Sequence, residues 1–430
     1  MKILFIESEE TFYMPVKTKI PKRWAYLVEI ANYVSNKGNE VKVMDCLDPS
    51  ISHAEILEEV AKNNYDLICF LMRIETVNSM LKLVPLIRKI SPQTKLLTYG
   101  DAPCMFVNYI KKNFGDLDAI VEGGDWEVAI CNYAKFINEG ESNVDDIPGV
   151  TIKRGENWID AKRCNGEKFT EWSFPDLENK ICNSDLYLKL KDNEVTVSVS
   201  RGCPYNCKFC LAVKTFDKAD RRKDPNEIVD FMEKYKDKVS TFKLFSPTFT
   251  YDEKWVEDLC NIIIQRNLKV QWVVTSRPDK LQNKDLLKLM SKAGCKRVAV
   301  GIETLDEKAN KELKKFNNIE NYKNSVKKMF NYANEQNITI KPLLMMGING
   351  QNKTNIKETL NFLGNCGAKD IRIAAYSPRQ LLSEEDRNGT ITLEKINKMD
   401  KMTYVNYMPE ELDNSSFLNL IYNTKKYNEL

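Results

Sequence analysis

The chain has 430 residues, of which 43% are hydrophobic and 29% charged, a composition typical of a folded globular protein with a large core. At about 150 residues per domain, this length predicts two or three domains. A net charge of +3 and the lack of any apolar run near 18 residues argue against a nucleic-acid or membrane partner. The first residues do not resemble a signal peptide, so we expect a cytoplasmic protein.

The first 140 residues alternate between strand and helix patterns, which predicts a doubly wound α/β domain with a parallel sheet. Ligands in this architecture bind at the carboxyl ends of the strands, here residues 7–15, 71–76, 99–103 and 122–127. The expected strands are 2–7, 40–45, 66–72, 94–100 and 118–123, and the expected helices are 24–38, 54–63, 79–90 and 126–137.

Residues 141–190 are irregular and are interpreted as a linker with short strands and turns. From Glu194 onward, six strand patterns alternate with five helix patterns. Parallel strands joined by right-handed crossovers curl into a barrel, and six units predict a partial barrel that is open on one side. The expected strands are 194–200, 240–246, 270–276, 297–303, 338–346 and 370–377, and the expected helices are 225–235, 252–264, 284–294, 321–335 and 355–367.

The chain has twelve cysteines and one histidine. Without an export signal, the cysteines are expected as thiols, metal ligands or catalysts rather than disulfides, and the scattered ones as small buried side chains. A single histidine argues against a Ser-His or Cys-His pair and against a multi-histidine metal site. His53 precedes a predicted helix and is interpreted as a surface or capping residue.

Three cysteines lie within eight residues in the loop after the first barrel strand, in a C-x3-C-x2-C pattern. Structural zinc usually takes four ligands in two pairs, and no second C-x2-C pair is present. A redox dithiol needs only two cysteines, and an iron–sulfur cluster takes thiolates. A [4Fe–4S] cluster held by three cysteines leaves one iron open to a substrate. Three unrelated thiols would explain the pattern without any cofactor.

The stretch "RGCPYNCKFC" (201–210) resembles the signature of radical S-adenosylmethionine (SAM) enzymes. The resemblance implies that Cys203, Cys207 and Cys210 bind a [4Fe–4S] cluster whose fourth iron chelates SAM, and that Phe209 flanks the adenine. One electron from the reduced cluster would cleave SAM to methionine and a 5′-deoxyadenosyl radical. The expected electron donor is a reductant such as flavodoxin or ferredoxin. The (βα)6 partial barrel of this family agrees with the strand count.

Other strand ends carry weaker matches to the same family. A "GIE-[ST]" turn places Gly301, expected to let the backbone approach the cofactor, and Glu303 at the fourth strand. The fifth-strand turn resembles "G-x-P-G-E-T", with Asn349 in place of the proline and Gln351 in place of the glutamate. A Gly-Gly-Glu-like stretch is replaced by Ser-Pro-Thr at 246–248. The resemblance thus implies SAM contacts from Phe209, Ser246, Arg277, Gly301, Glu303, Gly347 and Tyr376.

A doubly wound domain ahead of such a barrel resembles the cobalamin-binding subgroup of radical SAM enzymes, which are often methyltransferases. The resemblance implies cobalamin contacts from two loops that contain Gly100, Asp101, Glu122, Gly123 and Gly124. The D-x-H-x-x-G motif of other cobalamin proteins is absent, so the lower face of cobalt would meet residues 71–76 or stay open. The alternative is a domain that has lost this ligand and only packs or recognises substrate.

The sequence therefore predicts a Rossmann-like cobalamin-binding domain (1–140), a linker (141–190), a radical SAM partial TIM barrel (191–380) and a C-terminal segment (381–430) that helps to form the substrate pocket. The favoured function is cobalamin-dependent methylation of an unactivated carbon in a small molecule or peptide. A second hypothesis is ring formation, rearrangement or peptide modification without methyl transfer. Less favoured hypotheses are a non-catalytic iron–sulfur carrier and a methylthiotransferase. No catalytic side chain beyond the cofactor ligands is identified.

Overall fold

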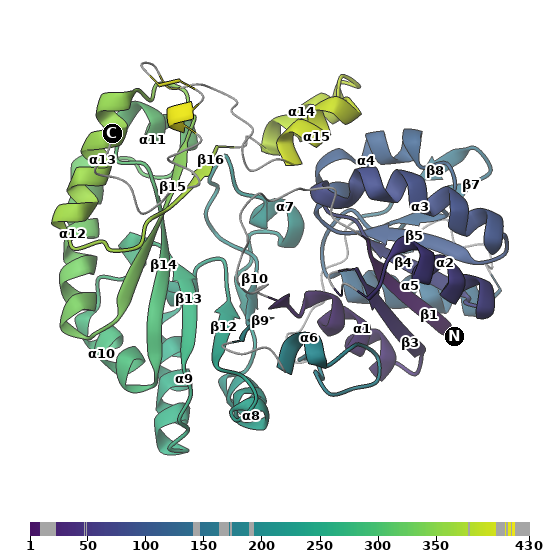
Figure 1. The fold of residues 1–430 in the computed structure, drawn as a ribbon, viewed down its shortest axis with the longest axis horizontal. Coiled ribbons are helices and arrows are strands. Elements are labelled where there is room, and N and C mark those ends of the chain that lie inside the picture. Colours follow the sequence, from purple (N-terminus) through teal and green to yellow (C-terminus); the bar gives the residue numbers. More distant parts are fainter. Residues whose placement is uncertain are drawn as a thin grey trace. The chain divides into compact units, whose positions relative to one another are not determined.

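The structure is a computed structural model, and it describes residues 1–8, 23–46, 48, 50–140, 147–162, 172, 174–188, 193–376, 379–400, 409, 412–413 and 415–417 (Figure 1). The chain divides into two compact units. The first comprises Met1–Leu190, Leu211–Ala219 and Arg379–Asp400, and the second comprises Lys191–Cys210, Asp220–Pro378 and Lys401–Leu430. Within the described residues, no helix has the length and apolar character needed to cross a membrane.

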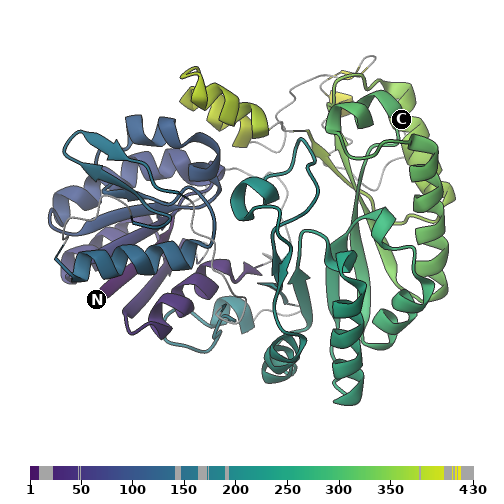
Figure 2. The ribbon, with the colours of Figure 1, turned by 180° about the vertical axis from the view of Figure 1, so that it is seen from behind.

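The first unit is built on a sheet with the strand order β3-β1-β4-β5-β6-β7-β8. Neighbouring strands from β3 to β6 are parallel, whereas β7 and β8 continue the sheet in antiparallel fashion beyond β6 (Figure 2). The chain order reverses between β1 and β4, which makes this the topological switch point of the sheet. The strands are β1 (Lys2–Glu7), β3 (Glu40–Asp45), β4 (Leu67–Leu71), β5 (Lys95–Tyr99), β6 (Ala119–Ile120), β7 (Thr151–Arg154) and β8 (Asn157–Ile159).

Apolar side chains that alternate along the strands bury one face of this sheet under α1 and α5. Ile3 and Phe5 of β1 and Leu67, Cys69 and Leu71 of β4 share one core with both helices, as the two-residue period of a strand requires. The helices and short turns of the unit are α1 (Tyr26–Asn36), α2 (His53–Lys62), η1 (Ile74–Thr76), α3 (Val77–Ile90), α4 (Asp101–Asn113), α5 (Trp126–Asn138), α6 (Asp185–Leu188), α7 (Ala212–Phe216), α14 (Arg379–Arg387) and α15 (Leu393–Asp400), and a short strand β2 spans Arg23–Trp24.

The helix α4 is interrupted at Phe106, whose φ of −144° and ψ of 58° are not helical. The interruption leaves the backbone N–H groups of Asn108 and Tyr109 without their intrahelical acceptors. The carboxylate of Asp386 in α14 accepts from both N–H groups, at 2.9 and 2.7 Å. Asp386 therefore caps the second half of α4 and fastens α14 to the first unit.

The second unit is a partial barrel whose strands β9, β12, β13, β14, β15 and β16 are parallel and adjacent in chain order. A small antiparallel pair, β10 (Ser200–Arg201) and β11 (Arg221–Arg222), follows the first of them. The barrel strands are β9 (Glu194–Ser198), β12 (Thr241–Phe245), β13 (Trp272–Ser276), β14 (Cys295–Glu303), β15 (Thr339–Met346) and β16 (Arg372–Ala375).

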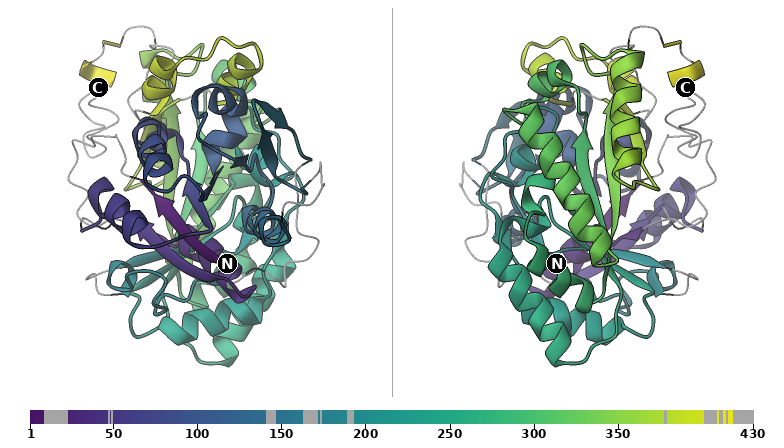
Figure 3. Two further views of the ribbon diagram at one scale, coloured as in Figure 1. Left: turned by 90° about the vertical axis from the view of Figure 1, so that its right-hand side faces the viewer. Right: turned by 90° about the vertical axis from the view of Figure 1, so that its left-hand side faces the viewer.

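Helices cover the outer side of the barrel strands, as Figure 1 and the side views of Figure 3 show. Most of them begin at an Asp or Asn whose side chain accepts a backbone N–H of the first turn, which fixes where each helix starts. The helices and short turns are α8 (Pro225–Tyr235), η3 (Phe249–Tyr251), α9 (Glu253–Gln265), η4 (Pro278–Lys280), α10 (Lys284–Lys292), α11 (Glu307–Leu313), α12 (Ile319–Glu335) and α13 (Lys353–Asn365).

The predicted α/β architecture with a partial barrel of parallel strands is confirmed. One part of the segment interpreted as a linker differs from that interpretation, because residues 151–159 pair with the sheet of the first unit as β7 and β8. Of the predicted C-terminal segment, residues 381–400 belong to the first unit and contain the rest of α14 and all of α15. Most later positions lie outside the described residues. The predicted ligand loop at 7–15 lies outside them beyond Ser8.

Candidate functional site

The predicted SAM-site residues of the second unit all lie at or just beyond the carboxyl ends of their strands. Because the strands are parallel, these ends form one rim of the barrel, where sites form in barrel enzymes. The cysteine loop follows β9 and β10, Ser246 follows β12, and Arg277 follows β13. Glu303 ends β14, Gly347 follows β15, and Tyr376 follows β16.

The three cysteines of the loop differ in exposure. Cys203 is buried and 8% exposed, whereas Cys207 and Cys210 are half-buried. The backbone N–H of Cys210 donates to the carbonyl of Cys207 at 3.1 Å, which closes a tight turn between the last two cysteines. Burial raises the pKa of the Cys203 thiol, while the N–H of Tyr205, the hydroxyl of Thr248 and the charge of Arg277 act in the opposite direction.

The loop offers three thiols, the ligand type of iron–sulfur clusters. Across the described residues, no three histidine, cysteine or carboxylate side chains converge on a point that could hold one metal ion. A cuboidal iron–sulfur cluster instead takes one thiolate per iron, so its ligands are spread over separate corners. A guanidinium group, that of Arg277, lies 3.6 Å from the sulfur of Cys207 and adds a positive charge beside an anionic ligand set.

A buried ion pair closes the end of β14. The ammonium group of Lys315 donates to Glu303 at 2.7 Å and to the carbonyl of Gly301 at 2.6 Å. Glu303 has a φ of 66°, at a register shift between β14 and β15. A Cβ atom on Gly301 would lie 2.6 Å from a carboxylate oxygen of Glu303 and 2.9 Å from the Lys315 nitrogen. Glycine at this position therefore leaves room for the ion pair, and its predicted role in cofactor approach stays a prediction.

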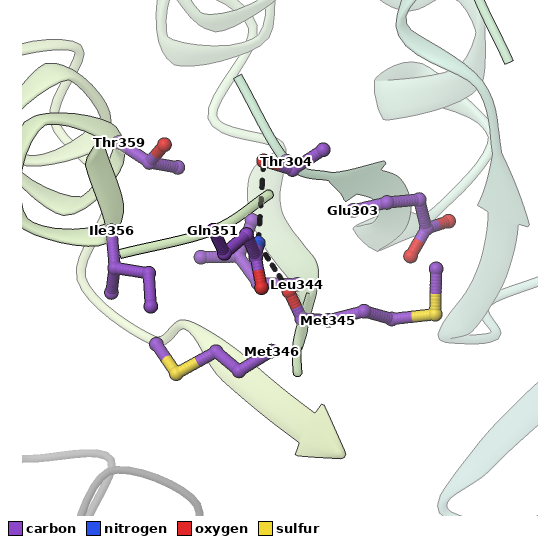
Figure 4. Close-up of a pocket in the computed structure, with 8 residues that line it drawn as sticks. All are labelled: Glu303, Thr304, Leu344, Met345, Met346, Gln351, Ile356 and Thr359. Carbon is purple, nitrogen blue, oxygen red and sulfur yellow. Dashed lines mark hydrogen bonds between the residues drawn. The ribbon is translucent and has the colours of Figure 1, made fainter. Parts of the chain in front are cut away.

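The turn after β15 is held by Gln351, which lines a pocket with Glu303, Thr304 and Met345 (Figure 4). Its side-chain oxygen accepts from the N–H groups of Gly347 and Ile348, both at 3.0 Å, and its nitrogen donates to the carbonyl of Met345 at 3.2 Å. The cavity volume of this pocket is about 10 Å³, barely enough for one water molecule. Pockets for drug-sized ligands usually measure roughly 300–1,000 Å³, so we assign no ligand to this one.

Two other predicted SAM residues make contacts within the protein. Ser246 is fully buried, and its hydroxyl accepts a hydrogen bond from Ser200 at 2.6 Å. Tyr376 is 4% exposed and shares a small apolar cluster with Ala309, Leu313 and Ile348, against which Phe209 packs. Phe209 and Tyr376, distant in sequence, thus belong to the same apolar packing region.

The glycine loops of the first unit have structural roles of their own. Gly100 has a φ of 128°, and a Cβ atom there would lie 2.3 Å from the carbonyl oxygen of Met72, so this close approach requires glycine. Glu122 accepts from the hydroxyl of Thr151 at 3.0 Å. Gly124 donates its N–H to the carbonyl of Thr215 in α7 at 2.7 Å. Asp101 begins α4, next to Gly100, and Gly123 and Gly124 both have positive φ.

A polar cluster at the switch point of the first unit has no counterpart among the sequence-based predictions. The Nε2 atom of His53 lies 2.8 Å from the hydroxyls of both Ser8 and Ser79, which are 2.5 Å apart. His53 is therefore half-buried and hydrogen-bonded rather than a surface or capping residue, and Ser52 is the N-cap of α2. Nearby, Arg73 after β4 pairs with Glu7 of β1 at 2.5 Å.

Aromatic side chains gather at the carboxyl end of β5. The ring of Trp126 lies 5.3 Å from Tyr26, 5.6 Å from Tyr99 and 5.6 Å from Phe216 of α7, between ring centroids. The Tyr99 hydroxyl and the Trp126 indole nitrogen are buried and have no hydrogen-bond partner among the residues that the structure describes. Buried polar groups are usually satisfied, so these two atoms are candidates for contact with a ligand.

The second unit combines a parallel partial barrel with a three-cysteine loop after its first strands. Residues 197–363 match the Radical SAM superfamily, so the chain contains a radical SAM domain. An anaerobic magnesium-protoporphyrin IX monomethyl ester cyclase from Rubrivivax gelatinosus is 22% identical over 393 residues, or 88% of this chain and 68% of the relative. A hopanoid C-3 methylase from Methylococcus capsulatus is 22% identical and covers 73% of this chain, which spans 59% of that protein.

Two solved structures are similar over most of the chain and show a common fold. The radical SAM methyltransferase TsrM from Kitasatospora setae, determined with tryptophan substrate and a SAM analogue, has a TM-score of 0.72 at 16% identity and covers 88% of this chain and 75% of its own. The cobalamin-dependent SAM radical enzyme OxsB, with aqua-cobalamin bound, has a TM-score of 0.69 at 16% identity and covers 100% of this chain and 62% of its own.

Proposed function

We propose that this chain is a cobalamin-dependent radical SAM enzyme that methylates an unactivated carbon of a small molecule or peptide. The observation that carries the proposal is the loop of Cys203, Cys207 and Cys210 on the rim of a parallel partial barrel, with Arg277 beside it. When bound there, a [4Fe–4S] cluster supplies the electron that cleaves SAM, and cobalamin supplies the methyl group. Methylation is supported by relatives that include the hopanoid methylase and by the fold of TsrM.

The protein's own residues would prepare the rim for these cofactors. Cys203, Cys207 and Cys210 would hold the cluster, and Thr248 would lie beside Cys203 at 4.0 Å. Glu303 is already paired with Lys315, so this carboxylate would present a neutralised rather than an isolated charge to SAM. Phe209 would offer its ring to the adenine from the apolar cluster around Tyr376.

Cobalamin is proposed at the switch point of the first unit. Ligands of doubly wound sheets bind where the strand order reverses, here between β1 and β4. The buried hydroxyl of Tyr99 and indole N–H of Trp126 favour a polar ligand at the carboxyl end of β5, beside the Gly123–Gly124 loop. Two of the predicted cobalamin residues are engaged elsewhere in the protein. The side chain of Glu122 accepts from Thr151, and Gly100 is required by its close approach to Met72.

A second candidate is a radical SAM reaction without methyl transfer. The cyclase from Rubrivivax gelatinosus, which matches 88% of this chain, favours ring formation. According to their names, the similar proteins act on a tetrapyrrole ester, a hopanoid and tryptophan, so the proposed substrate is kept at the level of a small organic molecule or peptide.

Anaerobic reconstitution followed by turnover with methyl-labelled SAM tests the proposal. We expect reductive formation of 5′-deoxyadenosine, an absorbance change when cobalamin is added, and a product heavier by one labelled methyl group in a panel of cell extracts analysed by mass spectrometry. A product without the label would favour the second candidate. Absence of both iron–sulfur cluster and 5′-deoxyadenosine would refute both.

Cys207→Ala should lose cluster binding and SAM cleavage together. Cys366→Ala is the matched control, since it removes a half-buried thiol at the C-terminal end of α13, outside the cysteine loop, and should keep the iron content and SAM cleavage of the parent protein. Production of 5′-deoxyadenosine by the Cys207 variant at the parent rate would refute the assignment of this loop.

A further inference from the structure

The guanidinium group of Arg277 has a partner at each of its three nitrogens. Nε donates to Asp279 at 3.0 Å, one terminal nitrogen donates to the sulfur of Cys207 at 3.6 Å, and the other donates to the carbonyl of Lys315 at 3.4 Å. A planar guanidinium presents its donors in a fixed fork, so these contacts fix its orientation. The group is directed at a cysteine of the loop and not at open space.

Two aromatic rings also contact the guanidinium group of Arg277. The guanidinium carbon lies 3.8 Å from the ring centroid of Tyr205 and 4.7 Å from that of Phe316. Phe316 stacks on Tyr322 at 3.5 Å, and the Tyr322 hydroxyl donates to the carbonyl of Ile302 in β14 at 2.9 Å. The support for Arg277 therefore reaches back to a barrel strand.

The cation is held in a low-dielectric environment. Arg277 is 7% exposed, and its charge acts on nearby sulfur with little screening by water. A second buried cation of this rim, Lys315, is paired with the carboxylate of Glu303. Arg277 is itself paired with Asp279, whose side chain is 33% exposed, so its charge is only partly neutralised.

We propose that Arg277 is a positioning residue that raises the reduction potential of the cluster by hydrogen-bonding to the sulfur of Cys207, rather than a SAM ligand. The inference rests on the proposed function, because it requires the cluster at the three cysteines. Reduction adds one electron to the cluster, and a nearby positive charge stabilises the reduced form. A hydrogen bond to a ligand sulfur acts in the same direction.

The midpoint potential of the reconstituted full-length protein, measured by redox titration with electron paramagnetic resonance, tests the proposal. Arg277→Gln should shift the potential to more negative values, and Arg277→Lys should shift it less, because it keeps the charge but loses the fork. Asp279→Asn should shift it to more positive values, since the guanidinium then lacks its counter-charge. SAM affinity, measured by calorimetry, should stay within a few-fold of the parent value in all three.

Arg297→Gln is the matched control. It removes one guanidinium that pairs with Glu194 at 2.9 Å near the amino ends of β14 and β9, at the opposite end of the strands, and it should leave the potential unchanged. If the Arg277 variants assemble no cluster, the direction of the shift in midpoint potential in Asp279→Asn alone tests the inference. Parent-like potentials in variants with full iron content, or a loss of SAM binding without a shift in potential, would overturn the inference. A parent protein that binds no cluster would instead refute the proposed function.

Discussion

The ammonium group of Lys315 lies 2.7 Å from a carboxylate oxygen of Glu303, and their side chains are only 4% and 10% exposed. Burying two charges costs desolvation energy, which their attraction repays only when the geometry and the remaining hydrogen bonds are good. Here Lys315 also donates to the carbonyl of Gly301 at 2.6 Å. The pair therefore holds the end of β14 in its strained conformation at Glu303.

Removal of one partner of this pair should be strongly destabilising. Lys315→Met or Glu303→Met leaves an uncompensated buried charge, and we expect each to lower the free energy of unfolding by about 3–5 kcal/mol. The double variant should lose much less free energy of unfolding than the two single variants added together, because it leaves no unpaired buried charge. Urea unfolding followed by circular dichroism measures all three. Additive losses in the double variant would show that the two side chains are not coupled.

Gly301→Ala should destabilise the protein through the same ion pair. The added methyl group would come within 2.6 Å of Glu303 and 2.9 Å of Lys315, and we expect a loss of about 1–3 kcal/mol as the buried pair shifts. Gly364→Ala in α13 is the control, since its methyl group meets no atom within 4 Å and should stabilise the helix by about 0.5–1 kcal/mol. Equal effects of the two substitutions on the urea midpoint would contradict this explanation.

Gln351 should be required for its amide and not only for its size. Gln351→Glu, which introduces the residue of the family turn, keeps the acceptor for Gly347 and Ile348 but loses the donor to Met345, and we expect a loss of about 1–3 kcal/mol. Gln351→Leu leaves the backbone N–H groups of Gly347 and Ile348 unsatisfied, so it should lower the stability more than Gln351→Glu does. Gln265→Glu, on an exposed position at the end of α9, should change stability by less than about 0.5 kcal/mol. A Leu variant more stable than the Glu variant in chemical denaturation would reverse the expected order.

Asp386 should give the stability of the first unit a specific pH dependence. Burial raises the pKa of this carboxyl, and the N–H groups of Asn108 and Tyr109 offset part of the rise. The folded state then binds the proton more tightly than the unfolded state, whose pKa is about 3.9, so this contribution to stability falls as the pH rises from there through the folded pKa. The free energy of unfolding of the parent minus that of Asp386→Asn should therefore decrease over this window. A difference that increases with pH would contradict the raised pKa.

Local patterns are sufficient to predict most of the alternating strands and helices of both units. They miss α4, which is interrupted at Phe106, and α11, which has only seven residues. The strand at Lys2–Glu7 and the strand at Glu40–Asp45 are predicted to the residue, because short apolar runs there end at charged or polar positions. The pairing of β7 and β8 is missed, since strands of three or four residues carry too few side chains to establish a two-residue period.

Contacts between distant residues account for the missed parts of the site. Lys315 lies in the sequence "KELKKFNN", which has the composition of a solvated helix end, and only the fold brings it to Glu303. Ser8 and Ser79 are 71 positions apart, so nothing near His53 in the sequence indicates that their hydroxyls enclose it. Arg277 is predicted as a site residue from its place at the end of a strand, but its contact with Cys207 requires the structure.

The division of the chain has a consequence for protein engineering, because the backbone passes from one unit to the other after residues 190, 210, 219, 378 and 400. A cassette cut once near residue 190 would transplant the sheet of the first unit without α7, and Trp126 and Tyr26 would lose the ring of Phe216. It would also lose the cap that Asp386 supplies to α4. Shuffling this half among related enzymes therefore calls for three grafted pieces in place of one crossover.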